Sequence, residues 1–138
     1  MTTVNVRYMV DDVGAAVDFY TTHLGFTPIT TYGDAFADVG RGELRLLLSG
    51  ATSSAGRPMP DGRQPEPGGW NRILLIVDDI ASETKRLREA GVTFRNETVT
   101  GPGGKQIVLE DPSGNPIELF QPADDRPVRS SRGPDGPA

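Results

Sequence analysis

The sequence predicts an α+β protein built from two copies of one βαβββ unit. A strand-like segment leading into a helix occurs twice, each helix is followed by a glycine and three strand-like segments, and a stretch rich in glycine and proline separates the copies. We expect a single domain over residues 1–121, with module one at 3–49, an inter-module loop at 50–69 and module two at 70–121.

The first module opens with alternating residues at 4–10, which predict a strand, and continues into Asp11 and Asp12. Apolar residues then recur at the spacing of a helix face: Val13, Ala16, Val17, Tyr20 and Leu24. Asp12 is a suitable N-cap and Gly25 a suitable helix terminator. A strand followed by an amphipathic helix is therefore predicted.

The second module repeats this pattern, with a strand at 72–77, the acidic pair Asp78 and Asp79, and a helix with Ile80, Thr84 and Leu87 on one face. Its helix ends at Gly91. We interpret the acidic pairs of both modules as helix caps, although their residue types would also suit a cation cluster.

Three strands are expected after each helix, at 26–31, 34–39 and 43–49 in module one and at 92–97, 105–110 and 115–121 in module two. The loop at 50–69 is long enough to cover a site as a lid, and a plain linker is the alternative. Residues 122–138 have the composition of a disordered tail.

Composition narrows the range of partners. The 138-residue chain has a net charge of −5, which argues against nucleic-acid binding. It contains no cysteine, so thiolate metal sites and cysteine nucleophiles are excluded. No apolar stretch is long enough to span a membrane, and we expect a cytoplasmic protein.

Three phrases carry a family resemblance: VDDV at 10–13 leading to DFY and LGF, GWNR at 69–72 leading to VDDI, and EDPSGNPIEL at 110–119. In this order they resemble the vicinal oxygen chelate superfamily, which includes glyoxalases, extradiol dioxygenases and bleomycin-resistance proteins. The resemblance implies paired modules, each forming a curved half-barrel sheet, and a homodimer.

Metal-using members of that superfamily take one ligand from the first strand and one from the last strand of each module. Counting along the repeats places these positions at Asn5, Arg45, Arg72 and Glu118. An arginine has no lone pair to give and repels a cation, so we expect no metal and no cofactor. The only histidine, His23, falls at the end of the first helix and is expected to be structural.

Strand alternation predicts which neighbours share a face with these four residues. The resulting ligand-binding set is Asn5, Arg7, Met9, Arg45, Leu47, Trp70, Arg72, Leu74, Ile76, Glu118 and Phe120. It describes a mostly apolar cup with a polar floor. Trp70 would stack on a ligand, with a core position as the alternative.

Two functions remain open at this point. The first is a metal-independent binding protein that sequesters a bulky hydrophobic or aromatic natural product, as in antibiotic resistance. The second is a glyoxalase-, isomerase- or dioxygenase-like enzyme that uses Glu118 as a base beside Arg45 and Arg72. The two arginines would alternatively form only a salt-bridge cluster with Glu118.

Overall fold

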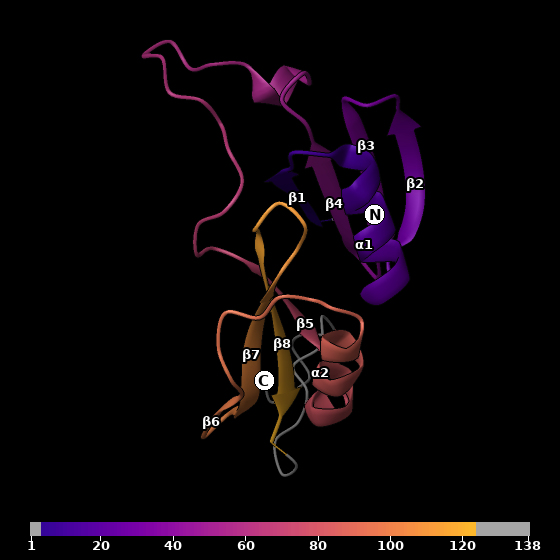
Figure 1. Cartoon of the computed structure of the whole chain (residues 1–138), viewed down its shortest axis with the longest axis vertical. Helices are drawn as coiled ribbons and strands as arrows, with labels where there is room; N and C mark the ends of the chain where they lie inside the picture. The colour runs from indigo at the N-terminus through magenta and orange to yellow at the C-terminus, as the bar shows by residue number, and fades with distance from the viewer. Residues whose placement is uncertain (1–3, 124–138) are drawn as a thin grey trace, which may run out of the picture. The chain divides into compact units, whose positions relative to one another are not determined.

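A computed structural model describes residues 4–123 of the chain (Figure 1). The residues fall into two compact units, the first extending to Asn71 and including Glu110–Pro116, and the second containing Arg72–Leu109 and the chain from Ile117. The predicted tail lies outside the described residues from 124 onward. Within the described residues, no helix has the length and apolar character that crossing a membrane requires.

The first unit is a four-stranded mixed sheet with one helix packed on it (Figure 1). Its elements are β1 (Val4–Met9), α1 (Val13–His23), β2 (Thr27–Tyr32), β3 (Phe36–Arg41) and β4 (Leu44–Ser49). The strand order is β1-β4-β3-β2, and only β1 and β4 are parallel. Buried side chains from α1, β3 and β4 form its core: Val13, Ala16, Phe19, Tyr20, Ala37, Val39, Leu46 and Leu48.

The second unit has the same order of elements: β5 (Ile73–Ile76), α2 (Ile80–Glu89), β6 (Val99–Gly101), β7 (Gly104–Glu110) and β8 (Pro116–Pro122). The strand order is β5-β8-β7-β6, with β5 parallel to β8. The predicted α+β fold with two βαβββ modules is confirmed. Between the modules, Gly50 to Asn71 contains only the short 3-10 helix η1 (Ser54–Gly56).

One predicted strand is wrong. Residues 92–97 make a single bridge, Phe94 to Leu109. The first of the three strands that follow α2 is instead the short β6 at Val99–Gly101. The side chain of Asn96 accepts a hydrogen bond from the amide of Val108 at 2.9 Å. This amide is thereby taken by a side chain rather than by a backbone carbonyl, which interrupts a regular ladder.

Both acidic pairs supply helix caps, as predicted. The carboxylate of Asp12 accepts from the amide of Ala15 at 3.0 Å, and that of Asp79 accepts from the amide of Ser82 at 3.1 Å. Such caps stabilise a helix by about 1 kcal/mol each. One aspartate of each pair, Asp12 and Asp79, therefore caps the N-terminus of its helix.

The turn at 111–115, which connects β7 and β8, belongs to the first unit, and a buried carboxylate organises it. Asp111 is 4% exposed and accepts hydrogen bonds from the hydroxyl of Tyr20 at 2.8 Å and from the side-chain amide of Asn115 at 3.0 Å. That amide also donates to the carbonyl of Met9 at 2.7 Å, and the Tyr8 hydroxyl donates to the Pro116 carbonyl at 2.7 Å. The DPSGNP phrase is thus a structural motif.

Burial, reinforced by the negative charge of Asp111, raises the pKa of Tyr20 well above its ordinary value. We predict that the free energy of unfolding falls as the pH rises above about 10, because unfolded Tyr20 releases its proton there and folded Tyr20 keeps it. The slope for one such group is about 1.4 kcal/mol per pH unit.

Denaturant unfolding of the wild type and of Tyr20→Phe between pH 8 and 11 measures this contribution, since the other tyrosines are common to both. The stability difference between them should shrink at that slope above about pH 10. Parallel curves would show that Tyr20 ionises normally in the folded protein.

Candidate functional site

Strand register shows which residues occupy equivalent places in the two modules. Leu74 of β5 pairs with Glu118 of β8, and Arg7 of β1 pairs with Leu47 of β4. Arg7 and Leu74 each stand three residues before the valine of their VDD phrase, so the equivalent of Glu118 is Leu47.

The prediction that Arg45 occupies that place is therefore wrong. It assumed that Asp38 and Asp111 are equivalent, but Asp38 lies inside β3 whereas Asp111 follows the end of β7. The β3–β4 connection is the tight turn at Gly42 and Glu43, and the β7–β8 connection is longer, at 111–115. Counting from the aspartates therefore placed the position at Arg45, two residues before Leu47.

Arg45 has its own carboxylate partner in the first sheet. Its Nε donates to Oδ2 of Asp38 at 2.5 Å, and the amide of Thr30 donates to Oδ1 at 3.0 Å. Asp38 is completely buried, so the guanidinium compensates a charge that would otherwise be costly. Asn5 lies beside Arg45 as its cross-strand partner and is exposed.

The second unit contains the predicted pair of Arg72 and Glu118. The Nε and Nη2 atoms of Arg72 lie 3.0 and 2.9 Å from Oε1 of Glu118, which is 7% exposed. The salt-bridge interpretation is confirmed for Arg72, while the second guanidinium expected at Glu118 is paired with Asp38 instead.

These residues do not fit a divalent metal ion. By register the four family positions are Asn5, Leu47, Arg72 and Glu118, of which leucine has no donor atom and arginine no available lone pair. Glu118 is the only common ligand type, and it is engaged by Arg72. Among residues 4–123 no group of three or more His, Cys, Asp or Glu side chains is suitably placed for a metal.

The only histidine of the sequence lies at the end of a helix. His23 is the last residue of α1, and its ring contacts that of Phe19 with centroids 5.5 Å apart. The structural role expected for His23 stays a prediction.

Apolar side chains are exposed on the sheet face of the second unit. Leu74 and Ile76 of β5 are 47% and 42% exposed, while the alternate residues Ile73 and Leu75 are buried. Phe120, at the same parity as Glu118, is half-buried. Burial of such side chains by a ligand or a partner would be favourable.

Trp70 is 70% exposed in the chain, so its alternative interpretation as a core residue is wrong. It precedes β5 by three residues and ends the first unit together with Asn71. In the first unit, Met9 and Leu47 are half-buried at the same parity as Arg7.

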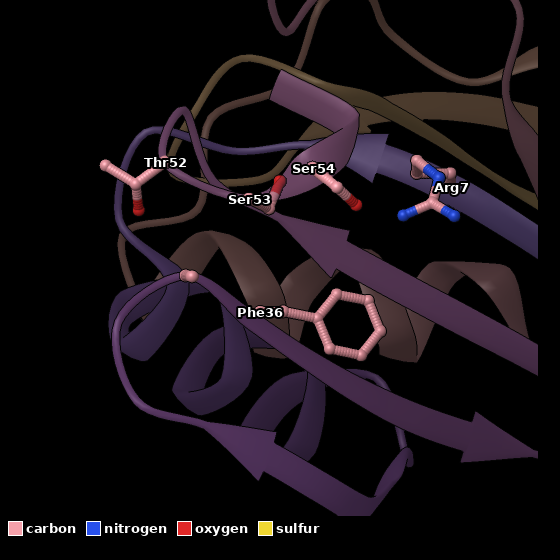
Figure 2. A pocket seen from close by; sticks show the side chains of 6 residues that line it. Arg7, Phe36, Thr52, Ser53 and Ser54 are labelled. Carbon is pink, nitrogen blue, oxygen red and sulfur yellow. The ribbon is translucent and has the colours of Figure 1, made fainter. Parts of the chain in front are cut away.

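A pocket of about 440 Å³ lies in the first unit (Figure 2). Its lining residues are Arg7, Ala35, Phe36, Thr52, Ser53 and Ser54. Arg7 was predicted as a site residue and the others were missed. Phe36 pairs with Ser49, which shares the parity of Arg7 and Leu47, so strand alternation could have found it. Residues 52–54 lie outside the strands, so strand alternation could not have identified them.

The comparisons with known proteins support this architecture. Residues 3–119 match the family model of the Glyoxalase/Bleomycin resistance protein/Dioxygenase superfamily. The chain belongs to this superfamily. No match is found among proteins with curated descriptions.

Solved structures of the superfamily resemble the chain over most of its length. The antibiotic binding protein TnmS3 from Streptomyces sp. CB03234 is 28% identical, with a TM-score of 0.69, covering 89% of this chain and 97% of its own. A superfamily member from Sphaerobacter thermophilus is 29% identical, with a TM-score of 0.70 and coverage of 88% and 97%. Lactoylglutathione lyase from Agrobacterium tumefaciens, at 19% identity, a TM-score of 0.69 and coverage of 87% and 92%, shows the fold alone.

Proposed function

We propose that the protein binds a bulky hydrophobic or aromatic natural product without a metal ion and without transforming it. The main support for this proposal is the ion pair of Glu118 with Arg72. Glu118 is the only carboxylate among the four superfamily metal positions, and Arg72 engages it. On the sheet face of the same unit, Leu74 and Ile76 present apolar surface. Apolar surface with few polar groups suits ligand binding by burial and stacking.

The similarity to an antibiotic binding protein supports the same proposal. TnmS3 is 28% identical over nearly its whole length. A scaffold shared by many activities does not by itself define a function, so the residues must agree with the comparison. The residues of this chain support binding without a metal ion, because the superfamily metal positions contain one usual metal ligand rather than four.

The enzyme alternative requires Glu118 to accept a proton from a substrate. One oxygen of Glu118 accepts two contacts from Arg72, and the side chain is 9% exposed. Arg45, the second residue of that mechanism, is bound to Asp38. A general base must reach the proton that it removes, and this arrangement favours the binding function.

A neutral fluorescent probe, 1-aminoanthracene, tests the proposal. We predict that the wild type binds this probe saturably. Trp70→Ala should weaken the binding free energy by about 1 to 3 kcal/mol, because the variant loses the indole ring that stacks on the probe and its apolar surface. The melting midpoint should change little, since Trp70 is exposed. Val99→Ser, at an exposed apolar residue of β6, serves as the control and should leave binding unchanged.

Absence of saturable binding to the wild type would contradict the proposal. A large loss of stability in Trp70→Ala with unchanged affinity would instead show that Trp70 supports the fold. Both readings come from one titration and one thermal scan of each variant.

We also propose that the protein is a homodimer, as the resemblance implied. Val4 of β1 and Ile29 of β2 are 62% and 54% exposed, and a second copy would bury apolar surface of this kind. Light scattering at micromolar concentration should give twice the mass of the 14.8 kDa chain. A monomer mass would contradict this proposal.

A further inference from the structure

We propose that the pocket of the first unit recognises a carboxylate on an aromatic ligand, with Arg7 binding the carboxylate and Phe36 contacting the ring. This inference rests on the proposed function and names the chemical class of its ligand. It depends on three features of the first unit: an arginine without a carboxylate partner, two hydroxyl groups on the pocket wall, and an aromatic pair.

Arg7 differs from the other arginines predicted to be in the site. Arg45 and Arg72 are each bound to a buried carboxylate, whereas none of the ion pairs within residues 4–123 involves Arg7. The one hydrogen bond of its side chain runs from Nη1 to the hydroxyl of Ser49 at 2.9 Å. Ser49 is completely buried at the end of β4, so this bond anchors the guanidinium beside that strand.

A guanidinium has five N–H donors, and one bond to a serine leaves donors for a ligand. Its planar fork matches the two oxygens of a carboxylate and forms charge-assisted hydrogen bonds with them. In a chain with a net charge of −5, a cation without an acidic partner in its pocket marks a specific place for an anionic group.

Hydroxyl groups from the start of the inter-module segment line the same pocket. Ser53 donates to the carbonyl of Gly50 at 2.6 Å and so stabilises this turn. Ser54 and Thr52 present their side chains at the pocket wall, and Figure 2 shows the Ser54 hydroxyl directed toward the side where Arg7 lies. A hydroxyl can donate to the carboxylate that Arg7 holds.

The opposite wall is aromatic. Phe36 lines the pocket and is half-buried, and its ring lies 5.7 Å from that of Tyr32, tilted by 36°. Tyr32 is 64% exposed and extends the aromatic surface beyond Phe36 along the β2–β3 hairpin. The pocket volume of about 440 Å³ falls in the range of small-molecule sites. A planar ring bearing a carboxylate matches both walls.

Calorimetric titration with 2-naphthoate and its neutral counterpart 2-naphthamide tests this inference in the full-length protein. We expect the wild type to bind 2-naphthoate at least about tenfold more tightly than the amide, because only the carboxylate forms charge-assisted bonds with Arg7. Arg7→Met should remove this preference, Arg7→Lys should retain part of it, and Phe36→Leu should weaken both probes.

Arg63→Met is the matched control, because Arg63 is an exposed arginine of the same unit that is paired with Asp61. It should leave both affinities unchanged. Melting midpoints of all variants verify that each one folds. Equal affinity of the wild type for the two probes, or a carboxylate preference that survives Arg7→Met, would overturn the inference.

The proposed function is tested separately with 1-aminoanthracene in the same variants. Binding of that neutral probe to the wild type and Arg7→Met, without a preference for 2-naphthoate, would overturn only the carboxylate inference. Failure of the wild type to bind any of the three aromatic probes would overturn both.

Discussion

A buried carboxylate must be compensated within the protein, and this constraint determines how the polar residues of the chain are arranged. Asp38, Asp111 and Glu118 are all buried. Asp38 is paired with Arg45, Glu118 with Arg72, and Asp111 accepts hydrogen bonds from Tyr20 and Asn115. Removing one partner would leave an uncompensated charge, which costs several kcal/mol. Each carboxylate therefore serves the fold first.

The same constraint explains how a superfamily with metal-using members can include a chain with this site. A metal ion neutralises the carboxylates that bind it, and here a guanidinium neutralises Glu118 instead. Leu47 occupies the position in the first module that corresponds to Glu118 in the second. What remains available for a ligand is apolar surface in the second unit and the pocket beside Arg7 in the first.

Most of the fold could be predicted from the sequence because repeated local signals specify it. The VDD phrases predicted where both helices begin. The alternation of side chains along β1, β4, β5 and β8 predicted which residues of these strands share a face. The strand expected at 92–97 failed because the Asn96 side chain replaces a ladder contact, which alternation does not encode. Arg45 was misplaced because the β3–β4 and β7–β8 connections differ in length, and turn geometry helps to set strand register. The pocket could not be predicted because it depends on the path of residues 50–56, and the sequence of this segment has no periodic pattern.

Metal content tests the central claim most directly. Elemental analysis of the purified protein, followed by calorimetric titration with Zn²⁺, Ni²⁺ and Mn²⁺, should detect no metal bound in a one-to-one ratio, and 1-aminoanthracene affinity should be unchanged by a chelator. The reason is that Leu47 and Arg72 cannot act as ligands at two of the four positions. One tightly bound metal ion per chain, with probe binding lost on chelation, would contradict the account.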